Sequence, residues 1–149
     1  MPFVPSILLV EDNPDDYEAT VRSLRENRCM NPIRWCKNGR DALDLLGHER
    51  PDEARPAELP AIILLDLNLP GIDGRDVLQA VKSDPHLRRI PVVILTTSSD
   101  ERDIDRCYEI GASTYVQKPV SFAGLTAAIR TLRDYWFGLA ILPGTGEWP

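Results

Sequence analysis

The sequence predicts an α/β protein in which helices cover both faces of a parallel β-sheet. Short apolar runs recur along the chain, and each is followed by a stretch whose apolar residues have helical spacing. This alternation of strand and helix, repeated five times, is typical of a three-layer sandwich around a parallel five-stranded sheet. We expect one domain, because 149 residues match the size of a domain that buries its own core.

The five apolar runs are the predicted strands. They are apolar on both faces, as in strands buried between two layers of helices. They span residues 7–10, 33–36, 62–65, 92–95 and 114–116.

Each predicted helix follows a residue that can cap its amino end. Such side chains accept hydrogen bonds from the backbone N–H groups that lack partners in the first turn. The capping candidates are Asn13, Asn38, Asp73, Asp100 and Ser121. Pro14, directly after the first cap, suits the first position of a helix.

Composition narrows the class of protein. The net charge of −6 opposes binding to a polyanion, so we expect no nucleic-acid partner. The apolar runs are far shorter than the roughly 20 residues that span a bilayer, and no secretory signal precedes them, so we expect a cytoplasmic protein without membrane contact. The cysteines Cys29, Cys36 and Cys107 are odd in number and lack CxxC spacing, which indicates reduced thiols.

Two stretches interrupt the alternation. Residues 48–60 are rich in Pro, Glu and Arg, and we expect a solvated surface loop there. Residues 138–149 form an apolar C-terminal extension that is too short for an effector domain. We therefore expect a domain over residues 1–137 that acts through contacts with other proteins.

Polar residues follow four of the predicted strands. They are Glu11 and Asp12, Asp66, Thr96 and Lys118, in chain order. Ligands of open parallel sheets bind outside the carboxyl ends of the strands, so we expect these side chains to converge on one pocket. Each residue alone also fits an ordinary place at a helix start, turn, strand end or surface, but their joint occurrence favours a site.

Three neighbouring carboxylates repel one another by roughly 3 kcal/mol per pair, at about 5 Å and an effective dielectric near 20. A divalent cation relieves this repulsion, and oxygen ligands suit Mg²⁺. Lys118 adds a further positive charge, and together these charges can neutralise a phosphoryl group in transfer. The pattern predicts an aspartate nucleophile, Asp66, that forms an acyl phosphate.

The sequence resembles the receiver domains of two-component signalling. The matching segments are ILLVEDN (7–13), IILLDLNLPGIDG (62–74), PVVILTTS (91–98) and GASTYVQKP (111–119), and the resemblance covers residues 6–137. It implies a flavodoxin-like (βα)5 fold with strand order 2-1-3-4-5. It also implies a response regulator that receives a phosphoryl group from a sensor histidine kinase in a Mg²⁺-dependent phosphorelay and signals by changing shape.

The resemblance implies a role for each residue of the acidic site. Asp66 matches the phosphoacceptor and, with Asp12, the carboxylates that bind the metal directly. Asn68 matches the position that ligates Mg²⁺ through its backbone carbonyl. Glu11 matches the second acidic residue, which reaches the metal through water.

The resemblance also assigns the remaining polar residues. Thr96 and Lys118 match the hydroxyl and ammonium groups that bind the phosphoryl oxygens. Tyr115 matches the aromatic switch whose ring turns inward when Thr96 moves, although a tyrosine at the edge of the core is the simpler alternative. The bond between Lys118 and Pro119 matches one that is usually cis in the family.

Some features depart from the shortest receivers. Thr97 stands where a small residue is common, and Ser98 follows it, so both hydroxyls are expected to affect access to the phosphoryl group. The 48–60 insertion, the TTSS run and the 135–142 tail resemble single-domain regulators paired with bacterial and cyanobacterial phytochromes. That resemblance implies a phytochrome-type kinase as the partner.

The apolar tail predicts a homodimer. Its residues are more apolar than a solvated helix end usually is, so we expect the tail or the last helix to pack on a second copy. The residues concerned are Tyr135, Trp136, Phe137, Leu139, Ile141 and Leu142, with Trp148 beyond them. Gly138 would end the helix and free the tail, while the alternative is a tail that folds back on its own domain.

Three other functions fit the sequence less well. A hydrolase with Asp66 as nucleophile usually has a second acid two residues later, where this chain has Asn68. A nucleotide- or flavin-binding module would carry GxxxxGK[ST] or GxGxxG, and neither occurs. A pseudo-receiver would lack Asp66, Lys118 or the acidic pair. We therefore expect a signalling protein that promotes only its own phosphorylation and dephosphorylation, not an enzyme.

Overall fold

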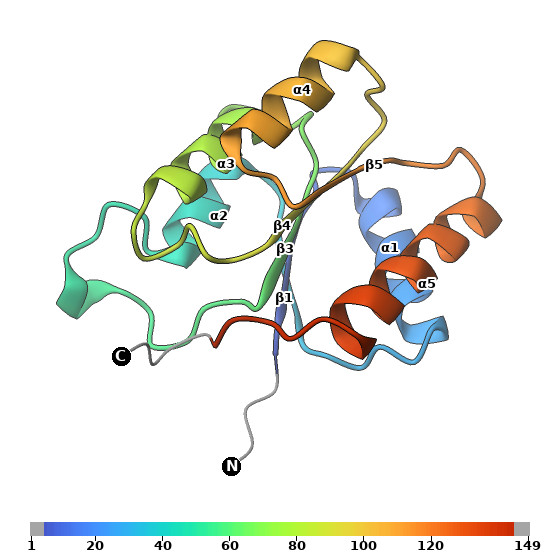
Figure 1. Ribbon diagram of the computed structural model, residues 1–149, viewed down its shortest axis with the longest axis horizontal. Coiled ribbons are helices and arrows are strands. Elements are labelled where there is room, and N and C mark those ends of the chain that lie inside the picture. The colour runs from blue at the N-terminus through green and yellow to red at the C-terminus, as the bar shows by residue number, and fades with distance from the viewer. Residues whose placement is uncertain (1–4, 145–149) are drawn as a thin grey trace.

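The computed structural model describes residues 5–144, and this part of the chain forms a parallel five-stranded sheet between two layers of helices (Figure 1). The strand order is β2-β1-β3-β4-β5, which confirms the predicted fold. Strands β4 and β5 each extend one residue beyond the prediction. The strands are β1 (Ile7–Val10), β2 (Ile33–Cys36), β3 (Ile62–Leu65), β4 (Val92–Thr96) and β5 (Thr114–Gln117).

Each of the five α-helices begins at its predicted cap. In every case the side chain of the capping residue accepts a hydrogen bond from a backbone N–H of the first turn. The helices are α1 (Pro14–Glu26), α2 (Gly39–Leu46), α3 (Gly74–Ser83), α4 (Glu101–Ile110) and α5 (Phe122–Gly138). The last helix therefore includes Gly138, and the predicted extension starts one residue later.

The helices divide between the two faces of the sheet (Figure 1). Helices α1 and α5 pack against each other on one face, and α2, α3 and α4 cover the other. The side chains of β1 alternate between the two cores: Leu8 and Val10 face one, and Ile7 and Leu9 face the other. Burial on both faces explains the continuous apolar runs of β1, β3 and β4. The expectation is wrong for β2 and β5, which are only partly buried because they lie at the edges of the sheet.

The 48–60 segment is exposed over most of its length, as predicted. Two of its residues, His48 and Arg55, tie it to Asp84. It contains a short 3-10 helix, η1 (Asp52–Ala54). The anchor is the carboxylate of Asp84, which is 5% exposed. His48 Nδ1 lies 3.1 Å from Asp84 Oδ2, Arg55 Nη1 lies 3.4 Å from the same atom, and the backbone N–H of His86 donates to Oδ1 at 2.9 Å.

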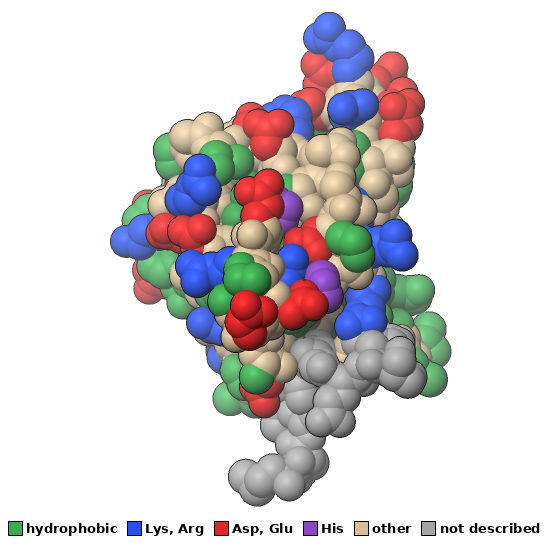
Figure 2. Space-filling view, turned by 90° about the vertical axis from the view of Figure 1, so that its left-hand side faces the viewer, with side chains coloured by type: hydrophobic (Ala, Val, Ile, Leu, Met, Phe, Trp, Pro, Cys, Tyr) green, Lys and Arg blue, Asp and Glu red, His purple; other side chains and the backbone are tan. Residues whose placement is uncertain are grey.

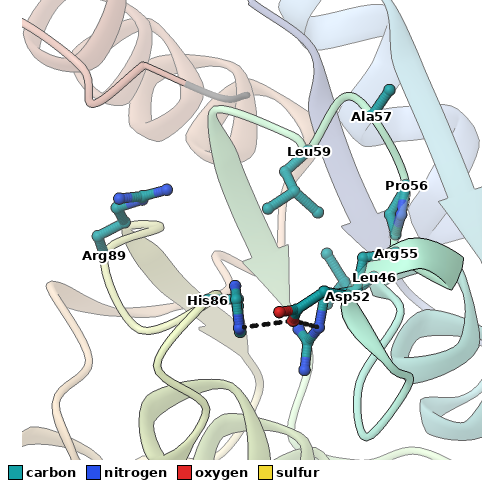
Figure 3. Close-up of a pocket in the computed structure, with 8 residues that line it drawn as sticks. All are labelled: Leu46, Asp52, Arg55, Pro56, Ala57, Leu59, His86 and Arg89. Carbon is teal, nitrogen blue, oxygen red and sulfur yellow. Dashed lines mark ion pairs between the residues drawn. The ribbon is translucent and has the colours of Figure 1, made fainter. Parts of the chain in front are cut away.

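A hollow of about 310 Å³ lies under this segment (Figure 3). Asp52 pairs across it with His86, at 3.3 Å from Oδ1 to Nε2, and with Arg55 at 3.9 Å. Figure 2 views the molecule from this side and shows acidic and basic side chains interspersed over its surface. The hollow involves residues that precede β3 and β4, so it lies at the amino edge of the sheet, away from the polar strand ends.

Two further findings concern the cysteines and the lengths of the apolar helices. All three cysteines are buried free thiols, and burial raises the pKa of Cys36 and of Cys107, which keeps these thiols protonated. Within residues 5–144, no helix has both the length and the apolar character that crossing a membrane requires.

Candidate functional site

The acidic residues converge at the carboxyl edge of the sheet, as predicted. The register places Val10 of β1 beside Leu65 of β3, so the residues after these two strands are neighbours. Carboxylate oxygens of Glu11, Asp12 and Asp66 all lie within 4.8 Å of one another. Glu11 and Asp66 are buried, whereas Asp12 is exposed at the mouth of the site.

The ammonium group of Lys118 lies among these acids. It donates to Glu11 Oε1 at 2.8 Å, to Asp66 Oδ2 at 3.0 Å and to Asp16 Oδ2 at 3.1 Å. Lys118 follows β5 and Glu11 follows β1, so one contact joins residues 107 positions apart in the sequence. A single buried cation thus faces more acidic groups than it can neutralise, which leaves the site ready for a second cation.

The pKa values of the two buried acids move apart. Burial, followed by the neighbouring Asp66 carboxylate, raises the pKa of Glu11 to about 9 against the pull of Lys118. Burial would also raise the pKa of Asp66, but the Glu11 carboxyl, the Lys118 ammonium and the Asn68 N–H outweigh it and lower that pKa. At neutral pH Asp66 is therefore the more readily ionised acid of the pair.

Two buried polar atoms at this edge have no hydrogen-bond partner within the described residues. They are Oε2 of Glu11 and Oγ1 of Thr96, whose side chain is fully buried. An unsatisfied buried polar group costs about 1–3 kcal/mol, so it usually marks a place where a ligand, ion or water binds. The orphaned Glu11 oxygen suits a cation, and the Thr96 hydroxyl can donate to an anionic oxygen.

The predicted switch and metal positions lie around this centre. Asn68 is exposed, and its N–H donates to Asp66 Oδ1 at 3.1 Å. The hydroxyl of Tyr115 donates to the carbonyl of Ser98 at 2.9 Å, and its ring packs against the core. Tyr115 therefore contacts the loop that follows Thr96. The metal-ligand role of Asn68 and the switch role of Tyr115 stay predictions.

The hydroxyl of Ser98 donates to Asp103 Oδ2 of α4 at 2.7 Å, and its effect on access to the phosphoryl group stays a prediction. One expectation about this edge is wrong. The peptide bond before Pro119 is trans, since the described residues contain no cis bond. The trans form is the more stable one for X-Pro by about 0.5–1 kcal/mol. Thr97 is exposed.

The structure adds residues that the sequence alone did not identify. Asp16, in the first turn of α1, binds the Lys118 ammonium. The indole of Trp35 donates to the carbonyl of Glu11 at 2.7 Å and stacks on Tyr17 with 3.8 Å between ring centroids. Any Cβ at Gly74 would collide with the Asp66 carbonyl, so α3 can begin against this strand end only with glycine. Of these residues, only Gly74 lies in a segment that the family resemblance had matched, namely residues 62–74.

The predicted dimer contacts divide into two groups. Trp136 and Phe137 pack against the core between the sheet and α5, so this part of the tail covers its own domain. Tyr135, Leu139 and Ile141 are 51%, 75% and 99% exposed, and Leu142 is half-buried. Trp148 lies outside the described residues.

Comparisons with known proteins agree with this arrangement. The model of the response regulator receiver domain matches residues 7–130. The chain belongs to this family, and it is a receiver domain of two-component signalling.

Individual members of the family are similar to this chain over most of its length. The probable methanogenesis regulatory protein FilR2 of Methanothrix harundinacea is 39% identical, over 96% of this chain and 89% of that protein. Response regulator Rcp1 of Synechocystis sp. is 36% identical, over 92% of each chain. The crystal structure of the phosphorylated cyanobacterial phytochrome response regulator RcpA superposes with a TM-score of 0.86 at 36% identity, covering 95% of this chain and all of that one.

Proposed function

We propose that the protein is a response regulator that accepts a phosphoryl group on Asp66 from a phosphohistidine of a sensor histidine kinase. The observation that carries this proposal is an ionised Asp66 bound to the Lys118 ammonium, with a buried Thr96 hydroxyl at the same edge of the sheet that has no partner among residues 5–144. A nucleophile, a cation and a free donor are the groups that phosphoryl transfer to a carboxylate requires.

The chemical step follows from these groups. A carboxylate oxygen of Asp66 attacks phosphorus, a P–O bond forms, and the P–N bond to the donor imidazole breaks. The electron pair of that bond stays on the imidazole nitrogen. Lys118, already 3.0 Å from Asp66, balances the negative charge of the transferred group, and the Thr96 hydroxyl donates to one of its oxygens.

The donor set fits a Mg²⁺ ion. Glu11, Asp12 and Asp66 offer hard oxygen ligands, and the orphaned Oε2 of Glu11 lacks a cation partner. We propose that Asp12 and Asp66 hold the ion directly, with the Asn68 carbonyl as a further ligand and Glu11 through water. Bound there, Mg²⁺ would supply charge neutralisation for the phosphoryl oxygens. A Mn²⁺-bound form of Rcp1, with a TM-score of 0.84 to this chain, supports a divalent site.

The test is the intact mass after incubation with acetyl phosphate and Mg²⁺. We expect a gain of about 80 Da, which corresponds to one phosphoryl group, in the wild-type protein and none in Asp66→Asn. Asp84→Asn is the matched control, because it changes the other buried aspartate and should still be phosphorylated. An adduct that persists in Asp66→Asn would assign the acceptor to another residue.

The partner of this site is proposed to be a phytochrome-type histidine kinase. RcpA, a phytochrome response regulator, supports this through a shared fold that covers 95% of this chain and all of RcpA. A phosphorylated phytochrome-type kinase should transfer its label to the wild-type protein far faster than an unrelated kinase does. Equal rates would remove the phytochrome assignment while leaving the acceptor in place. The cytoplasmic location stays a prediction.

We propose that output involves a homodimer formed through the exposed part of the tail. Leu139 and Ile141 present apolar side chains to solvent directly after α5, where a second copy can cover them. Sedimentation of Leu139→Ser/Ile141→Ser should show a monomer where the wild type is a dimer. Met30→Ser, which changes an exposed apolar residue elsewhere, is the control. A dimer that survives the double variant would contradict this contact.

A further inference from the structure

A network of ionic hydrogen bonds joins α3 to α4 beside the phosphoryl site. Arg75, in the first turn of α3, binds Asp103 of α4 through two bonds, Nε to Oδ1 at 2.7 Å and Nη2 to Oδ2 at 2.6 Å. Its third nitrogen, Nη1, donates to both oxygens of Asp73 at 2.9 and 3.0 Å. Paired, two-point bonds of this kind fix orientation as well as distance.

The same network reaches the loop after β4. Asp103 Oδ2 also accepts the hydroxyl of Ser98 at 2.7 Å, and the carbonyl of Ser98 accepts the hydroxyl of Tyr115 at 2.9 Å. Ser98 lies two residues after Thr96, whose buried hydroxyl has no partner within the described residues. Side chains from α4 and β5 thus hold the loop that directly follows Thr96, the last residue of β4.

The other end of the network is fixed to the acceptor. Gly74, the residue before Arg75, packs so closely on the Asp66 carbonyl that no side chain fits there, and its N–H donates to Leu67 at 3.0 Å. A continuous set of contacts therefore runs from the Asp66 backbone through Arg75 and Asp103 to Ser98. It sets the position of the β4–α4 loop relative to the acceptor.

A buried hydroxyl without a partner persists only where its surroundings determine its position, because an unrestrained strand end would turn it towards water or a carbonyl. We infer that Arg75, Asp103 and Ser98 are positioning residues that hold the Thr96 hydroxyl ready to donate to a phosphoryl oxygen on Asp66. This inference rests on the proposed function. It predicts that loss of the network weakens binding of the phosphoryl group while leaving the metal ligands in place.

The test measures the affinity for fluoroberyllate, an aspartyl-phosphate mimic, in the presence of Mg²⁺ by calorimetry or fluorine NMR. Asp103→Asn should weaken binding about tenfold, the size expected for one hydrogen bond involving a charged group. Ser98→Ala removes only the hydroxyl and should weaken it about threefold. The affinity for Mg²⁺ alone should not change, because neither variant alters an acidic ligand.

Asp100→Asn is the matched control. It neutralises the exposed Asp100–Arg102 pair on the same helix, and asparagine still caps that helix. Its fluoroberyllate affinity should equal that of the wild type. An Asp103→Asn affinity within about twofold of the wild-type value, or any tighter binding, would overturn the inference.

A double-variant cycle separates positioning from a general loss of structure. In a Thr96→Val background, which keeps the shape of the side chain and removes the hydroxyl, Asp103→Asn should have almost no further effect. An undiminished effect in that background would show that Asp103 acts by another route, and would overturn the inference. Failure of the wild-type protein to bind fluoroberyllate would instead overturn the proposed function, and the inference with it.

Discussion

The protein buries aspartates at both edges of its sheet, and the two sites are built differently. Asp84, near the amino edge, is matched by His48, Arg55 and the backbone N–H of His86, and no atom of its carboxylate lacks a partner. Asp66, at the carboxyl edge, shares one ammonium with Glu11 and Asp16. Within the described part of the chain, a hydroxyl and a carboxyl oxygen at this edge lack partners.

The difference separates a structural site from the proposed phosphorylation site. Buried charges that are fully paired fix a segment in place, which is what Asp84 does for the 48–60 loop. An excess of acid over base with orphaned polar atoms is poorly satisfied in the free protein, and added positive charge or a phosphoryl group can complete it. Substitutions at the two sites should therefore differ in their effects on stability and on metal binding.

The largest effect is expected on stability at Asp84. Asp84→Ala should lower the free energy of unfolding by about 3 kcal/mol, because it leaves the largely buried Arg55 and His48 without their partner. Asp66→Asn should change it by less than about 1 kcal/mol, since Glu11 can take over the charge opposite Lys118. Urea unfolding measures both. Asp52→Ala, which removes an exposed partner of Arg55, is the control and should cost under about 0.5 kcal/mol.

Binding of Mg²⁺ should stabilise the carboxyl edge. Saturation at 100 times the dissociation constant adds about 2.7 kcal/mol to the free energy of unfolding, by linkage. We expect the melting temperature of the wild-type protein to rise with Mg²⁺, and that of Asp12→Asn to stay nearly constant. Asp84→Asn should respond as the wild type does. An equal rise in Asp12→Asn would remove Asp12 from the metal site.

The contribution of Asp84 to the free energy of unfolding should decrease at acidic pH. The His86 N–H, His48 and Arg55 outweigh burial and lower the pKa of Asp84 in the folded state. Its contribution is therefore present above the unfolded pKa of about 3.9 and is lost as the pH falls through the lower folded pKa. Between about pH 5 and pH 2, Asp84→Asn should lose less stability than the wild type in urea titrations. Parallel curves would show that Asp84 titrates alike in both states.

Much of this organisation could be predicted from local sequence. Apolar runs gave the strands, and the residues Asn13 and Ser121, for example, capped the helices they precede, because both signals depend on neighbouring residues alone. The convergence of Asp66 and Lys118 followed from topology. The ties of His48 and Arg55 to Asp84, and of Arg75 to Asp103, could not be predicted, because they depend on how long side chains reach across the folded molecule.

The smallest effect is expected at Trp35, which supports the reactive site from outside. Its indole N–H holds the carbonyl of Glu11, and the stacked Tyr17 fixes the ring. Trp35→Phe keeps an aromatic ring for the stack but removes the donor, at a cost of about 1 kcal/mol. Because that hydrogen bond restrains the backbone between Glu11 and Asp12, we expect Mg²⁺ affinity to fall about threefold to fivefold in calorimetric titrations.

Tyr17→Phe keeps the ring stack and every bond to Glu11, so it should bind Mg²⁺ as the wild type does. If Trp35→Phe also binds normally, strand pairing alone positions the acidic pair, and the reactive edge is fixed by the sheet without help from its aromatic neighbour.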